Sequence, residues 1–121
     1  MLKELFGSIF GGAGSSAVKN VSVNETADIV KTGGVQFIDV RTNGEFAGGH
    51  AEKAVNMPLD KLSGLISKLD KEKPVYVICQ SGMRSMRGAS MLEAAGFTEV
   101  YNVSGGTSAW MSAGLKTKKG K

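Results

Sequence analysis

Cysteine and histidine each occur only once in this sequence, which excludes several kinds of site at the outset. The lone cysteine, Cys79, cannot close a disulfide within the chain, and one histidine beside it gives too few ligands for a zinc site. We therefore expect neither a bound metal nor a cofactor. Because no export signal is recognisable, the unpaired thiol indicates a reducing compartment, and we expect the protein in the cytoplasm.

Long apolar runs and an excess of charge in the body of the chain are also missing. No stretch approaches the roughly 18 apolar residues that a transmembrane helix needs, so the sequence predicts a soluble protein. The net charge of +4 comes from four lysines near the end of the chain, and the remainder is neutral. A neutral body with few aromatic side chains is not typical of a nucleic-acid-binding protein, and we expect no such partner.

The 121 residues have room for one domain with short extensions. Residues 1–20 are predicted to be a flexible leader and linker, because a short apolar segment over residues 1–10 is followed by glycine and serine. That segment has helical spacing, and membrane association through it is the alternative to a flexible leader. The domain is expected over residues 21–115, and residues 116–121 are expected to form a solvated basic tail.

Short β-branched runs alternate with amphipathic segments from residue 21 onward. This alternation is typical of an α/β fold in which about five parallel strands form a sheet with helices on both faces. The expected strands cover residues 21–23, 35–40, 54–57, 75–78 and 100–103. Asn24 and Asp60 are expected to cap the first two helices, and further helices are expected over residues 85–95 and 108–113. In such sheets, ligands bind at the carboxyl ends of the strands.

The segment after the fourth expected strand carries the residues best suited to chemistry. Cys79 lies between a strand and a helix, where backbone N–H groups and the helix dipole favour a thiolate over a thiol. Gly82 lets successive amides point into one concavity, and Arg84 adds a planar cation suited to an oxyanion. The expected substrate-binding residues are Gln80, Ser81, Gly82, Met83, Arg84 and Ser85. A lone cysteine is more often a core residue, but the polar and flexible positions after Cys79 make a poor core environment.

Three charged or titratable side chains elsewhere have two interpretations each. Asp39 and Arg41 could face a pocket, or they could form an ion pair that ties residues 45–50 to the sheet. We favour the ion pair, because buried charges need partners. His50 could act as a base for Cys79, although the spacing alone does not bring the two together. A thiolate that is already formed needs no base.

Four stretches of the chain, taken in order, resemble the rhodanese domain family. They are Asp39-Val40-Arg41 with Glu45-Phe46 and Gly49-His50, then residues 54–59, then residues 79–85, and finally Gly105-Gly106 with Trp110. The resemblance implies a sulfurtransferase in which Cys79 takes a sulfane sulfur from a donor such as thiosulfate. The cysteine becomes a persulfide and passes the sulfur to cyanide or a thiol. The resemblance also implies that the backbone N–H groups of the loop stabilise the persulfide and that His50 is mainly structural.

Other functions stay open beside this one. A cysteine phosphatase or arsenate reductase also holds a thiolate in an amide-lined loop that ends in arginine, but its loop is longer than the four residues that separate Cys79 from Arg84 here. A non-catalytic regulatory module of the same family usually lacks the cysteine. A carrier that delivers persulfide sulfur to a biosynthetic protein keeps the chemistry and changes the acceptor. Met83, an apolar residue at the loop tip, could favour an organic thiol or a protein partner.

Overall fold

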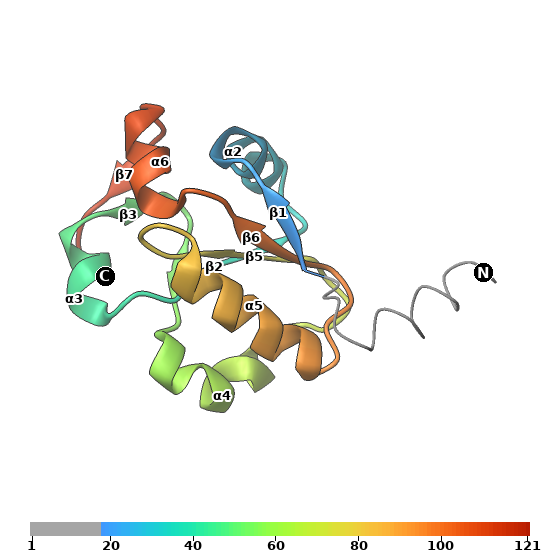
Figure 1. Cartoon of the computed structure of the whole chain (residues 1–121). Helices are drawn as coiled ribbons and strands as arrows, with labels where there is room; N and C mark the ends of the chain where they lie inside the picture. Colours follow the sequence, from blue (N-terminus) through green and yellow to red (C-terminus); the bar gives the residue numbers. More distant parts are fainter. Residues whose placement is uncertain (1–17) are drawn as a thin grey trace.

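Residues 18–121 are described by the computed structural model, and they form a five-stranded parallel sheet with helices on both faces (Figure 1). The strand order is β1-β6-β5-β2-β4, and each neighbouring pair in this sheet runs parallel. The predicted α/β fold class is therefore confirmed. The leader predicted over residues 1–20, including any membrane role of residues 1–10, lies almost entirely outside the described residues.

Short elements connect through brief loops along the chain. The strands are β1 (Lys19–Val21), β2 (Gln36–Asp39), β3 (His50–Ala51), β4 (Val55–Asn56), β5 (Val75–Ile78), β6 (Val100–Val103) and β7 (Thr117–Lys118). The α-helices are α2 (Val23–Thr32), α3 (Asn43–Gly48), α4 (Leu62–Leu65), α5 (Met83–Ala94) and α6 (Gly106–Ser112), with 3-10 turns η1 (Leu59–Lys61) and η2 (Ile66–Lys68). Within residues 18–121, no helix is long and apolar enough to cross a membrane.

The central strand β5 divides its side chains between two apolar layers, as the alternation of a strand requires. One layer contains Val75, Val77, Leu62 and Leu92, and the other contains Tyr76, Ile78, Val23 and Trp110. Helices α4 and α5 cover the first layer, while α2 and α6 cover the second (Figure 1). Each buried side chain of this size contributes about 1.5–3 kcal/mol. Burial on both faces fixes the register of β5 and hence the position where Cys79 begins the next loop.

The first strand and the first helix begin earlier than the sequence predicted. β1 starts at residue 19 and not at 21, so the domain extends into the expected linker. The predicted cap Asn24 is wrong, because the hydroxyl of Ser22 accepts the N–H of Glu25 at 3.0 Å. The Glu25 carboxylate in turn accepts the N–H of Ser22 at 3.2 Å, which completes a capping box. A Ser-x-x-Glu spacing was present in the sequence to indicate this start.

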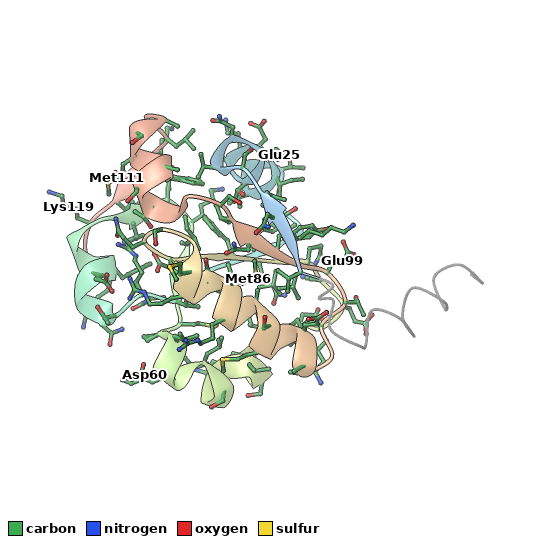
Figure 2. All side chains as sticks on the ribbon, viewed as in Figure 1. Glu25, Asp60, Met86, Glu99, Met111 and Lys119 are labelled. Carbon is green, nitrogen blue, oxygen red and sulfur yellow. The ribbon has the colours of Figure 1, made fainter. Side chains whose placement is uncertain are left out.

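The segment after β4 is not the single helix that Asp60 was expected to cap. Asp60 (Figure 2) lies inside η1, which is followed by the four-residue helix α4 and then by η2. The N–H of Leu59 donates to the carbonyl of Val40 at 3.0 Å, and this bond ties the start of the segment to the end of β2. The apolar spacing still places Leu62 wholly in the core, where it is 0% exposed.

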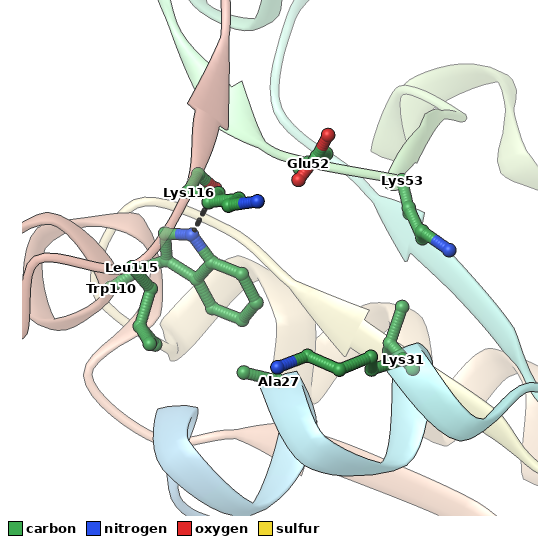
Figure 3. Close-up of a pocket in the computed structure, with 8 residues that line it drawn as sticks. Ala27, Lys31, Glu52, Lys53, Trp110, Leu115 and Lys116 are labelled. Atoms are coloured by element: carbon green, nitrogen blue, oxygen red, sulfur yellow. Dashed lines mark hydrogen bonds between the residues drawn. The ribbon is translucent and has the colours of Figure 1, made fainter.

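The last residues are not the free tail that their lysines suggested. β7 pairs antiparallel with β3, so its backbone is part of the fold. The indole N–H of Trp110 donates to the carbonyl of Lys116 at 2.7 Å (Figure 3). The carbonyl of Lys116 also accepts the N–H of Glu52 at 3.0 Å. The lysine side chains of residues 116–121 remain exposed, so their charges are solvated while the backbone is held.

Removal of residues 116–121 is expected to lower the free energy of unfolding by about 2–4 kcal/mol, because the indole of Trp110 and the backbone of β3 lose their partners. Chemical denaturation followed by tryptophan fluorescence measures the change. The matched control replaces the four lysines of this segment with alanine, which removes the charges and keeps the backbone bonds. That control should change stability by less than about 0.5 kcal/mol. Equal losses in the two variants would contradict a structural role for the backbone.

Candidate active site

A tight loop leaves β5 at Cys79 and returns over it to begin α5. Gly82 ends the loop with φ at 109°, a left-handed conformation that favours glycine, and it is the N-cap of α5. The helix begins at Met83, two residues before the predicted start. This geometry brings the N–H of Gly82 to 3.0 Å from Sγ of Cys79. The loop therefore closes around the sulfur atom.

The sulfur of Cys79 lies within a set of hydrogen-bond donors. Burial alone raises the pKa of Cys79, but the hydroxyl of Ser85, whose oxygen lies 3.3 Å from Sγ, and the N–H groups of Ser85, Gly82 and Ser81 outweigh burial. The net result is a pKa below the ordinary 9.0 and a larger thiolate fraction at neutral pH. Since the thiolate is the nucleophilic form, Cys79 is suited to attack an electrophile. The residue is buried, with an exposure of 1%.

The beginning of α6 holds the backbone of this loop from behind. The N–H and the hydroxyl of Thr107 donate to the carbonyl of Cys79 at 2.8 and 3.0 Å. The N–H of Ser108 donates to the carbonyl of Gln80 at 3.1 Å. Gly106 lies so close to the loop that a Cβ there would be 2.6 Å from the carbonyl oxygen of Gln80. With these carbonyls turned toward α6, the amides that follow can point at the sulfur.

Asp39 and Arg41 form the buried ion pair that the sequence favoured. The Arg41 guanidinium donates to the Asp39 carboxylate at 2.9–3.1 Å, and their side chains are 4% and 0% exposed. The same guanidinium donates to the carbonyl of Gly49 at 2.8 Å, which ties the turn after α3 to the sheet. It also donates to Oε1 of Gln80 at 3.2 Å. These two residues therefore support the loop through Gln80, and none of these bonds reaches the sulfur.

Arg84, the planar cation expected to suit an oxyanion, lies beside a carboxylate of α3. Its guanidinium makes a two-bond ion pair with the carboxylate of Glu45 on α3, at 2.8 and 3.0 Å. The hydrogen bond from Arg84 is the main cause that lowers the pKa of Glu45 to about 2. The pair is therefore fully formed above about pH 4.5 and is lost as the pH falls through about 2. The pKa of Arg84 is raised, first by Glu45 and to a smaller degree by the charge of Cys79. The guanidinium therefore still interacts electrostatically with the sulfur.

Two other candidates occupy different surroundings. Met83 is 80% exposed at the mouth of the loop, where an incoming molecule would meet it first. His50 is buried, with Nδ1 at 2.7 Å from the carbonyl of Phe46 and its ring stacked on that of Phe46 at 3.6 Å between centroids. These contacts give His50 a packing role, and they do not place it beside Cys79.

Asn102 contacts the site, although no motif in the sequence indicates it. It lies on β6 with 4% exposure, and its Oδ1 accepts the hydroxyl of Ser85. The only signal was a polar residue at a strand position that shares a face with Val100, where the alternation calls for an apolar side chain. That signal does not indicate which residue the amide contacts.

A separate hollow of about 470 Å³ lies between α2, the turn after β3, and the end of α6 (Figure 3). Its lining includes Trp110 and Leu115 with the lysines at positions 31, 53 and 116. None of the loop residues lines it, so it is not the site of the cysteine. Among the residues that the structure describes, there is no group of three or more His, Cys, Asp or Glu side chains placed to hold a metal ion.

Comparisons with known proteins lead to one kind of domain. Residues 22–113 match the family model described as Rhodanese-like domain. The chain is 35% identical over 98 residues to "Thiosulfate sulfurtransferase GlpE" of Shewanella oneidensis, which covers 81% of this chain and 97% of the relative. It is 37% identical over 116 residues to "Thiosulfate sulfurtransferase 16, chloroplastic" of Arabidopsis thaliana, which covers 86% of this chain and 96% of that protein.

A solved structure agrees with these sequence relatives. The crystal structure of a Rhodanese-like Domain Protein from Staphylococcus aureus superposes with a TM-score of 0.73 at 32% identity. The match covers 84% of this chain and 99% of that one. Fold and sequence similarity therefore extend over the same globular part that contains Cys79.

Gly106→Ala is expected to destabilise the protein by about 2–4 kcal/mol and to slow alkylation of Cys79 at neutral pH, because a methyl group would displace the loop carbonyls. Gly114→Ala is the matched control, since Gly114 has a similar φ of 73° with nothing within 4 Å of its added Cβ. The control should cost about 1 kcal/mol, the cost of the left-handed backbone, and leave alkylation unchanged. Thermal unfolding and iodoacetamide kinetics measure both effects. Identical behaviour of the two variants would show that the contact with the loop is unimportant.

Proposed function

Since this chain belongs to the rhodanese-like domain family, we propose that it is a sulfurtransferase that carries a sulfane sulfur as a persulfide on Cys79. The observation that carries the proposal is that backbone N–H groups point at Sγ of Cys79 and that the hydroxyl oxygen of Ser85 lies 3.3 Å from it. Such uncharged donors stabilise a single negatively charged sulfur, both in the thiolate and in the persulfide. The terminal sulfur of such a persulfide would lie about 2 Å from Sγ.

In the first half-reaction, the Cys79 thiolate attacks the outer sulfur of thiosulfate. A new S–S bond forms to Sγ, the S–S bond of thiosulfate breaks, and its electron pair leaves with sulfite. In the second half-reaction, a nucleophile such as cyanide or a thiolate attacks the terminal sulfur of the persulfide. The electron pair of the S–S bond returns to Sγ, and the thiolate is restored. No base is needed when the thiolate is already formed, which fits the position of His50 away from the sulfur.

The geometry gives less support to the other functions. In a phosphatase or arsenate reductase the arginine at the end of the loop would bind a tetrahedral oxyanion, but Arg84 is held by Glu45. A non-catalytic module does not require a nucleophilic thiolate, whereas the donors around Cys79 lower its pKa. Sulfur transfer uses both features, because it needs the thiolate and only a small anion-binding concavity.

The proposal also includes the kind of sulfur acceptor and the cellular compartment. A small thiol or cyanide can reach the loop mouth, and so can an exposed cysteine of a protein acceptor that packs against Met83. The nucleophile has to stay reduced between turnovers, so a reducing compartment such as the cytoplasm suits it. We propose no cofactor, since the half-reactions need only the donor, the acceptor and Cys79.

Replacement of Cys79 by serine is expected to reduce sulfur transfer from thiosulfate to cyanide by at least about 10³-fold, because a hydroxyl cannot form the persulfide. Thiocyanate formation measures the activity, and circular dichroism with thermal unfolding checks that the variant folds. Activity near that of the unchanged protein in a folded Cys79→Ser variant would rule out the proposed mechanism.

Glu45→Gln is expected to raise kcat/KM for thiosulfate by about 3–10-fold at low salt, since it leaves the Arg84 cation uncompensated beside the loop. Arg84→Ala should lower the same constant, because the Glu45 carboxylate then repels the anionic donor. An uncharged donor, such as a dialkyl trisulfide, should respond much less to either change, because only the effect of Arg84 on the Cys79 thiolate remains. Thr42→Ala is the control, because Thr42 caps α3 with Glu45 but does not contact Arg84. Equal effects on charged and uncharged donors would mean that the ion pair shapes the loop and does not set its charge.

A further inference from the structure

A line of hydrogen-bonded polar side chains leads from the edge strand β1 through β6 and α5 to the sulfur of Cys79. Asn20 and Asn102 are paired residues on β1 and β6, and Nδ2 of Asn102 donates to Oδ1 of Asn20 at 2.9 Å. Oδ1 of Asn102 accepts the hydroxyl of Ser85, whose oxygen is 3.3 Å from Sγ of Cys79. Three hydrogen bonds thus connect an exposed strand residue with the candidate nucleophile.

The two middle members of this line are buried. Ser85 is 0% exposed and Asn102 is 4% exposed, while Asn20 at the outer end is exposed. Val100, two residues before Asn102 on β6, belongs to the apolar layer beneath α5. A buried amide costs stability unless it is hydrogen-bonded, so packing alone favours an apolar residue at position 102. The amide is therefore explained better by its connection to Ser85 and Cys79 than by packing.

The hydroxyl of Ser85 has one proton and two neighbours that compete for it. When Cys79 is a thiol, the S–H donates to the Ser85 oxygen and the hydroxyl donates to Oδ1 of Asn102. When Cys79 is a thiolate, the sulfur can only accept, and the Ser85 proton has to turn toward it. Oδ1 of Asn102 would then lose its donor while buried, at the cost of an unsatisfied polar group.

A 180° rotation of the side-chain amides of Asn102 and Asn20 would give every buried polar group a partner again. If the Asn102 carboxamide rotates, its Nδ2 donates to the Ser85 oxygen and its Oδ1 faces Asn20, whose own amide rotates in turn. Every hydrogen bond of the line is then reversed, and each buried group again has a partner. A carboxamide can do this because it presents an acceptor and a donor at equivalent positions. The proton of Cys79 itself leaves to water, and none passes through the amides.

We propose that Asn102 is a positioning residue for sulfur transfer, which, with Asn20, lets the Ser85 hydroxyl reverse its direction as the sulfur of Cys79 gains and loses charge during turnover. The inference rests on the proposed function for the identity of the nucleophile. It extends that function by assigning part of the tuning of the thiolate to uncharged groups on two strands far from the loop in sequence.

Most charged groups near Cys79 are paired, so the uncharged line of Asn20, Asn102 and Ser85 can affect the thiolate. Asp39 and Arg41, at the end of β2, neutralise each other, and so do Glu45 of α3 and Arg84 of α5. Arg87 is a further cation on α5, whereas the sequences of β6 and α6 contain no charged residue. The direction of the hydrogen bonds is therefore a main influence on the stability of the Cys79 thiolate. The cation of Arg87 and the remaining field of the two ion pairs act beside it.

The decisive variants are at Asn20, which is exposed and does not touch the loop. Asn20→Asp offers only acceptors, so it should hold Asn102 with Nδ2 outward and keep the Ser85 proton on Oδ1. The pH midpoint of Cys79 alkylation by iodoacetamide should then rise by about one unit, a roughly tenfold loss of thiolate at neutral pH. Asn20→Ser can donate or accept, and its midpoint should match that of the unchanged protein. Asn102→Asp should shift the midpoint in the same direction as Asn20→Asp, and by more.

Salt separates this effect from the simple field of a new carboxylate. The exposed charge of Asn20→Asp is screened at about 1 M NaCl, whereas a locked amide is not. A shift that persists in high salt supports the proposal. A shift that disappears in salt, or that does not exceed the shift of Asn20→Ser, overturns it. Alkylation needs no sulfur donor, so the outcome is independent of whether the protein transfers sulfur.

Discussion

The fixed backbone of the loop after β5 is the constraint on which the rest of the site depends. Two carbonyls of the loop, those of Cys79 and Gln80, are held by N–H groups at the start of α6, 28 residues further along the chain. Gly106 allows the start of α6 to approach the loop, because a side chain at this position would collide with the loop carbonyls. With the carbonyls turned away, the amides of Ser81, Gly82 and Ser85 face the sulfur and lower its pKa despite burial. The lowered pKa of Cys79 therefore depends on contact between two segments, and the cysteine alone does not account for it.

Uncharged groups contribute much of the tuning of the site, because two arginines near Cys79 are paired with carboxylates. Arg41 is paired with Asp39 and supports the loop through Gln80. Arg84 is paired with Glu45, which leaves the mouth less cationic than the sequence suggests. Hydrogen-bond donors from the backbone and from Ser85 then decide how much thiolate is present. Such a site stabilises a negative charge on a sulfur atom at Cys79.

The sequence predicted features that depend on local pattern, and it missed those that depend on distant contacts. The buried strand β5 and the loop after Cys79 were predicted because apolar alternation, glycine and polarity are local properties. Which partner Arg84 selects was not predictable, since Glu45 lies 39 residues away and several cations and carboxylates were available. The pairing of β7 with β3 was hidden by lysines, which report the exposure of side chains and not the hydrogen bonds of the backbone. Asn102 was visible only as a break in an apolar pattern.

Intact-mass spectrometry shows directly whether Cys79 forms a persulfide. The reduced protein is incubated with thiosulfate, its mass is measured, and the measurement is repeated after addition of cyanide. If Cys79 forms a persulfide, the mass of the protein should rise by about 32 Da, and the added mass should be lost when cyanide is added. A folded protein with a free thiol that gains no mass from thiosulfate or from any other sulfane donor would contradict the proposed persulfide.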